Sequence, residues 1–163
     1  MVQELPSFAA TTTWTGTAGD FFWATPGNWD AGEVPAATND AVIASVGTAV
    51  QIPTGTTVPI AGLKLGTTGG ASLDVVGTLT MTGAVYVSCN ATGNTTRAMV
   101  HDGGLFNWTK DCTVGYRQGT GILSLSGGTV SAQTLTVGVG AFGASTRSSS
   151  KGVLVADDFD LTL

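Results

Sequence analysis

Hydrophobic and polar residues alternate in short segments along this chain, and from residue 63 the segments recur as a motif. Four short apolar segments end in a small residue: Leu63–Gly66, Val85–Ser88, Cys112–Gly115 and Leu135–Gly138. The small residues that end them are 22, 27 and 23 positions apart. Alternation with a period of two is typical of strands with one buried face. The spacing predicts an array of repeats built from short strands.

Two further kinds of short strand lie between those segments. The first kind is followed or interrupted by glycine, and the second comes directly after it. They cover residues 73–77, 99–104 and 122–128, and residues 78–81, 105–108 and 129–132. Three strands per repeat predict a triangular coil, a single-stranded parallel β-helix whose stacked turns bury the apolar rows. An antiparallel sandwich also has regularly spaced short strands, but the recurrence of whole motifs favours the β-helix.

Two segments lengthen the repeat. Residues 89–98 and 139–151 both fall in the interval between the first and second strands of a turn. We therefore expect both to leave the coil at the same corner, and loops on one side of a solenoid are its usual contact surface.

The composition agrees with an all-β chain and excludes several partners. Only 10% of residues are charged, 24 are glycine, 42% are hydrophobic and the mean hydropathy is +0.29. Glycine is a poor helix former, and disordered chains carry more charge and less apolar surface. The net charge of −5 makes nucleic acid a poor partner. No run of 18 apolar residues is present, so we expect no membrane span.

A break in composition near residue 62 divides the chain. All five prolines precede residue 60, all six basic residues follow residue 63, and three of the four tryptophans lie in the first part. We therefore predict an extended arm over residues 1–12, a cap over 13–62 and solenoid repeats over 63–163. The cap should bury its large aromatic side chains against the first turns near Leu63 and Leu65. These aromatic residues are Trp14, Phe21, Phe22, Trp23 and Trp29.

Candidate catalytic chemistry is weak. Enzymes on this fold need paired carboxylates, or acids with Arg or Lys, along one face. Asp74 and Asp102 occupy comparable turns without a basic residue at repeat spacing, and the adjacent His101 and Asp102 point to opposite sides of a strand. We therefore predict no enzyme activity, no metal site and no cofactor. The two cysteines, Cys89 and Cys112, are expected to be buried free thiols.

Several motifs of the N-terminal part stand in a fixed order. They are Trp14-Thr-Gly16, Gly27-Asn-Trp-Asp30, Gly32-Glu-Val-Pro35 and Asn39-Asp-Ala-Val-Ile43. Together with the Leu-x-Val-Gly and Gly-Gly-Thr-Val segments that follow, they resemble the leader and repeats of autotransporter-like β-helices in bacterial surface proteins and some phage structural proteins. The resemblance covers most of the chain from residue 13. It implies scaffolding or adhesion on a virion or a cell surface, and seldom catalysis.

Three functions follow as expectations. The first is a structural protein on a virion surface, made in the host cytoplasm, that decorates a capsid or forms part of a fibre. The second is a secreted bacterial adhesin, and a lesser third is a polysaccharide-binding or polysaccharide-degrading β-helix. Met1–Ala10 carries Glu4, no Lys or Arg and no long apolar segment, so we expect no secretory signal there; this favours the first.

The expected partners are capsid or other virion proteins and sister subunits in a homo-oligomer, with surface glycans as a further class. The N-terminal part would dock, while the loops face outward. The residues assigned to partner binding are Leu5, Pro6, Phe8, Trp14, Trp23, Trp29, Asn94, Arg97, Phe142 and Arg147.

Overall fold

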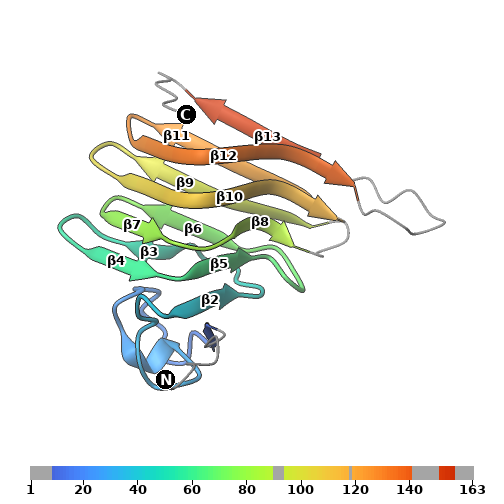
Figure 1. Ribbon diagram of the computed structural model, residues 1–163. Helices are drawn as coiled ribbons and strands as arrows, with labels where there is room; N and C mark the ends of the chain where they lie inside the picture. The colour runs from blue at the N-terminus through green and yellow to red at the C-terminus, as the bar shows by residue number, and fades with distance from the viewer. Residues whose placement is uncertain (1–8, 90–93, 118, 141–150, 157–163) are drawn as a thin grey trace, which may run out of the picture.

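The computed structural model describes residues 9–89, 94–117, 119–140 and 151–156, and they form a stack of short parallel strands with no α-helix (Figure 1). Every ladder between the named strands is parallel. Parallel pairing between consecutive turns is the topology of a β-solenoid, so the predicted fold class is confirmed and the sandwich is excluded.

The strands form three faces, which we call A, B and C. Face A contains β1 (Ala10–Thr13), β2 (Asn39–Ile43), β5 (Gly62–Leu65), β8 (Val85–Cys89) and the second halves of β10 (Leu105–Arg117) and β12 (Thr129–Gly140). Face B contains β4 (Thr57–Ile60), β7 (Thr78–Met81) and the first halves of β10 and β12. Face C contains β3 (Val50–Ile52), β6 (Ser72–Val75), β9 (Thr95–His101), β11 (Thr120–Ser126) and β13 (Lys151–Ala156).

Faces A and B belong to one bent sheet. The first half of β10 pairs with β7 and its second half with β8, and the register between β10 and β12 shifts between Trp108 and Asp111. A local irregularity of this kind bends a strand. The corner between faces A and B is therefore made within one long strand in the later turns.

The small residues that end the face A strands form one column, as predicted. Leu65 pairs with Val87, Val87 with Val114 and Val114 with Val137, so the next residues, Gly66, Ser88, Gly115 and Gly138, stack in register. Their φ angles are +67°, +69°, +77° and +75°. The left-handed region disfavours any residue with a Cβ, which explains why three of the four are glycine.

The core runs through the middle of the coil. In the face A column, Ile43, Leu65, Val87 and Val114 are each 0% exposed. Trp108 is also buried, and its Nε1 donates a hydrogen bond to the Thr134 carbonyl oxygen at 3.0 Å. Each of these side chains faces inward because the strand alternation places every second residue in the interior.

The solenoid begins before the predicted boundary at residue 63. Strands β2, β3 and β4 already stack on β5, β6 and β7, and so they form a turn within the segment 13–62 that was assigned to the cap. The boundary had been placed after the last proline, as if proline excluded strands. Pro59 has no N–H to donate, but it lies in β4 at the edge of the sheet, where proline is tolerated.

The cap proper precedes β2 and includes a 3-10 helix, η1 (Pro26–Asn28). The Trp14 N–H donates to the Val42 carbonyl at 2.8 Å, and the Trp23 N–H donates to the Gln51 carbonyl at 2.9 Å. The cap thus joins the first turn at β2 and β3, one turn earlier than the predicted contact with Leu63 and Leu65.

The two long insertions both precede strands of face C that start at the same corner of the coil, as expected. Thr95, Thr120 and Lys151 share one column at the start of face C, so both connections return from face A to face C at the same corner. β9 begins at Thr95, so residues 95–98 of the predicted loop 89–98 are strand. Residues 90–93 and 141–150 lie outside the described part of the chain.

Candidate functional site

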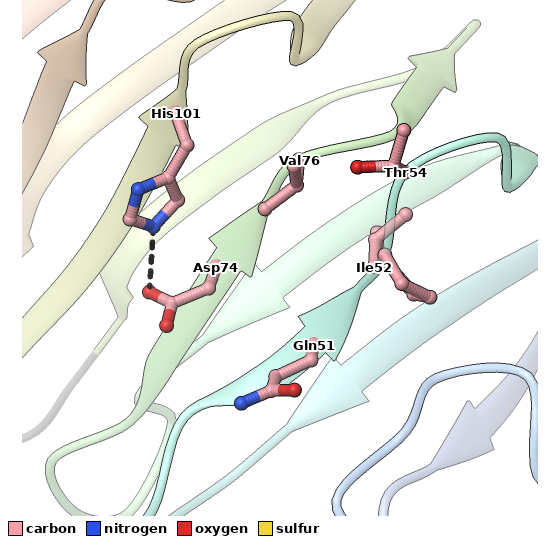
Figure 2. Close-up of a pocket in the computed structure, with 7 residues that line it drawn as sticks. Gln51, Ile52, Thr54, Asp74, Val76 and His101 are labelled. Atoms are coloured by element: carbon pink, nitrogen blue, oxygen red, sulfur yellow. Dashed lines mark ion pairs between the residues drawn. The ribbon is translucent and has the colours of Figure 1, made fainter.

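A pocket of about 350 Å³ lies on the outer surface of face C, near the cap end (Figure 2). Its lining comes from residues 51–54 at β3, from Asp74 and Val76 at β6, and from His101 at the end of β9. Gln51 pairs with Asp74 in register, and the residues before Val76 and His101, Val75 and Val100, also pair. Three successive turns therefore build the pocket.

Asp74 and His101 face each other within this pocket and form an ion pair when the imidazole is protonated. The His101 Nε2 lies 3.7 Å from the Asp74 Oδ1, and the two side chains are 35% and 32% exposed. Asp74 pairs with Met99, so His101 is two residues further along the neighbouring strand on the same outward side. Diagonal neighbours of this kind are within reach of long side chains.

From the sequence, His101 was compared only with the adjacent Asp102, and that dyad was rejected. The structure places His101 beside Asp74, a neighbour that was not considered. A signal was available, because Leu73 and Val100 are inward positions and the residues after them must both face outward. The turn-to-turn register that aligns the two strands was needed as well.

The pocket can form hydrogen bonds, but it lacks the geometry of an activated nucleophile. At 3.7 Å the imidazole and the carboxylate are beyond hydrogen-bond distance, and a half-exposed pair contributes about 0 to 1 kcal/mol. The hydroxyl in the lining belongs to Thr54, and in Figure 2 Val76 lies between Thr54 and the imidazole. Nucleophilic catalysis requires a base at about 2.6 to 3.2 Å from the hydroxyl.

The three tryptophans assigned to partner binding lie in the cap core. Trp14, Trp23 and Trp29 are 7%, 0% and 2% exposed. The Trp29 ring packs edge to face on both others, at 5.1 Å from Trp14 and 4.7 Å from Trp23, and its Nε1 donates to the Trp23 carbonyl at 2.8 Å. Their burial confirms the packing prediction, and it leaves these indoles unavailable to a partner.

Phe22 differs from its neighbours in the cap. It is 42% exposed, contrary to the prediction that it is buried, and it forms an isolated parallel bridge with Gln51. Trp23 follows Phe22 and Ile52 follows Gln51, and both of these following residues are buried. Because side chains alternate along a strand, Phe22 and Gln51 point outward. Phe22 therefore extends the outer column of Gln51 and Asp74 by one position.

The other assigned residues are dispersed. Arg97 is exposed on the outer surface of face C, and Asn94 is exposed just before β9, where its backbone carbonyl accepts a hydrogen bond from the Thr120 N–H at 2.9 Å. The structure does not bring them together with the pocket into one site. Leu5, Pro6, Phe8, Phe142 and Arg147 lie outside the described residues.

Cys112 is a buried free thiol on face A, aligned with Val85 and Leu135. Burial raises the pKa of this thiol to about 12, so the unreactive thiol form persists at neutral pH. Cys89 aligns with Tyr116, in a different column from Cys112.

Within the described part of the chain, no three His, Cys, Asp or Glu side chains group closely enough to hold a metal ion. The described residues also contain no helix long and apolar enough to cross a membrane.

Comparisons with known proteins add no relative. No protein-family model, no curated protein and no solved structure matches the chain.

Proposed function

We propose that the protein is a non-enzymatic structural protein that holds a rigid shape and presents a surface, as a capsid-decorating or fibre component of a phage virion. The observation that carries the structural role is the unbroken inner column of Ile43, Leu65, Val87 and Val114, each fully buried. Stacked turns of this kind form a stiff rod, because backbone ladders and one continuous core join every turn to the next.

The placement on a virion rests on the motifs of residues 14–43, which resemble the leaders of β-helices in phage structural proteins and bacterial surface proteins. A secreted bacterial adhesin has the same support from the motifs and remains the alternative. The two differ in where the protein is found, on virus particles or on cell envelopes.

In this proposal, the N-terminal part docks through the arm, residues 1–12, and through β1. With the cap tryptophans buried, β1 pairs with β2 on one side, and on its other side Asp30 already bonds the N–H and the carbonyl of Thr13. Only the part of this edge that precedes Thr13 can accept a further strand by main-chain hydrogen bonds. Residues 1–10 precede or begin this strand, and they contain the apolar Leu5, Pro6 and Phe8.

The test is co-purification of the natural protein, with and without residues 1–10. We expect the full chain to co-purify with virus particles, and the shortened chain to stay folded but fail to incorporate. Full incorporation of the shortened chain would exclude docking by the arm. Recovery with cell envelopes instead of particles would favour the adhesin alternative.

A second candidate function is saccharide binding at the face C pocket. Gln51, Asp74 and His101 offer an amide, a carboxylate and an imidazole to sugar hydroxyls, and the half-exposed ring of Phe22 continues the same column. A few convergent polar groups beside apolar surface are typical of small-molecule sites.

Titration of the purified protein with oligosaccharides from the host surface tests this candidate. Binding that is lost in Asp74→Ala and His101→Ala, but kept in the control Asp102→Ala, would support it. Release of shortened oligosaccharides by the wild-type protein at ordinary enzymatic rates would overturn the non-enzymatic proposal.

A further inference from the structure

At the last described turn, one position on face A and one on face C are exposed although the same positions are buried in earlier turns. Val87 and Val114 are 0% exposed, whereas Val137, the next member of their column, is 43% exposed. On face C, Ala98 and Leu123 are 0% exposed, and Leu154 above them is 37% exposed. The core is thus exposed on faces A and C at the last described turn, whereas Val130 and Ala132 on face B stay buried.

The same turn presents free backbone edges. β13 ends the order of the face C sheet, and β12 pairs only with β10 (Figure 1). Among the described strands, none pairs with the outer edge of either. Unpaired edges beside exposed apolar side chains template the addition of another chain.

At the opposite end of the coil, the cap covers the core. The cap seats its three indoles on the first turn, and Trp23 and Trp29 are almost completely buried. Figure 1 shows the cap at one end of the stack and β13 at the other. The capped end of a second copy therefore offers no exposed core to match Val137 and Leu154, whereas its C-terminal turn does.

The charges of the last turn suit self-association. β12 contains no Asp, Glu, Lys or Arg, and Lys151 is the one charged residue of β13, although the chain carries a net charge of −5. Two such ends can approach without the repulsion that acts between the rest of the two molecules. A self-complementary patch is what a two-fold interface requires.

The seven residues 157–163 follow β13 in the sequence and lie outside the described part of the chain. Three of the seven are aspartates, which are costly to bury on an apolar patch.

We propose that two copies of this chain associate through their C-terminal turns, so that Val137 and Leu154 of each cover the open core of the other. A two-fold axis brings β13 of one copy antiparallel to β13 of its partner. The inference rests on the proposed structural function and deepens it by naming the face through which sister subunits meet.

The experiment is sedimentation velocity on the purified full chain from about 1 to about 100 μM. We expect a dimer whose dissociation constant rises about tenfold or more in the double variant Val137→Asp/Leu154→Asp. Phe22→Asp is the matched control, because Phe22 is similarly exposed at the capped end, and its dissociation constant should equal that of the wild type. A wild-type monomer at about 100 μM, or equal weakening by Phe22→Asp, would overturn the proposal.

A second measurement needs no variant, in case the double variant fails to fold. Amide hydrogen exchange of the wild type should slow about tenfold or more in β13 between the low and the high concentration, with no change in β1. Equal exchange at both concentrations contradicts the interface. If deletion of residues 157–163 converts a monomer into a dimer, the chain's own end is the occupant and the proposal is wrong.

Both measurements use purified protein, so they are independent of the particle test. A dimer that never incorporates into particles would retain this interface and refute the virion placement. A monomeric protein that incorporates into particles would refute this interface and retain the virion placement.

Discussion

The corner where face A meets face C carries the sharpest stability prediction. A Cβ built on Gly66 would overlap the Thr96 Oγ1 and lie 3.0 Å from both the Thr96 Cβ and the Gly69 carbonyl oxygen. Thr96 is fully buried, and the equivalent residues in later turns are Gly121 and Gly152. One side chain, from Thr96, thus fills space that Gly66 leaves empty.

Gly66→Ala should therefore combine two costs. The left-handed φ of +67° costs a non-glycine residue about 1 to 2 kcal/mol, and overpacking the corner costs about 1 to 3 kcal/mol. We expect a loss of about 2 to 5 kcal/mol in the free energy of unfolding, measured by urea titration followed through tryptophan fluorescence. Gly103→Ala is the matched control, because its φ is +77° and no atom lies within 4 Å of a built Cβ; it should lose only about 1 to 2 kcal/mol.

A double-mutant cycle isolates the clash. Thr96→Gly reproduces the glycine found in the later turns, so Gly66→Ala/Thr96→Gly should be more stable than the sum of the single losses predicts, by about 1 to 3 kcal/mol. If Gly66→Ala costs no more than Gly103→Ala, or if the coupling energy is zero, the proposed complementarity at this corner is wrong.

Three further predictions concern the core and the cap. In a Cys89→Ser background, the Cys112 thiol, whose pKa burial raises to about 12, should react with a disulfide reagent at pH 8 only as fast as the protein unfolds; rapid reaction of the native protein would show that the thiol is accessible. Trp29→Phe removes the 2.8 Å hydrogen bond to the Trp23 carbonyl, whereas Trp23→Phe removes an Nε1 that has no partner among the described residues. Calorimetry should therefore show Trp29→Phe to be less stable than Trp23→Phe by about 1 to 3 kcal/mol. Equal losses of stability would contradict this role for the hydrogen bond. The hydrogen bond from the Thr25 hydroxyl is the largest of the effects that lower the pKa of Asp20, so this carboxylate stabilises the fold above its unfolded pKa and the effect is lost as the pH falls through the folded value. The melting temperature of Asp20→Asn should therefore decline less steeply below about pH 4 than that of the wild type, and parallel curves would exclude the contribution.

Much of the fold was predictable because its signals are local and repeated. The alternation of Leu63–Gly66 and its three counterparts identifies the inward residues, and the small residue at the end of each identifies the corner. All four corner residues have the left-handed φ that such a turn needs. Each repeat specifies the same local structure, so the errors of a single segment are averaged over several turns.

Other features depended on contacts between turns, which no single segment encodes. The pairing of Asp74 with His101, 27 residues later, requires the register between β6 and β9. The early start of the solenoid was missed because β3 and β4 are only 3 and 4 residues long, and one of the four is proline. The exposure of Phe22 beside the buried Trp23 follows from its bridge to Gln51, which composition cannot reveal.

By itself, then, the sequence determined an all-β solenoid with an aromatic cap, because period-two alternation and recurring small residues are properties of the chain alone. The tertiary structure decided which outward side chains share a pocket and which end of the rod is open. Val137 and Leu154 have the same apolar character as Val114 and Leu123 before them. Their exposure comes from their place at the last described turn, because a stacked position is buried only when a neighbouring turn covers it.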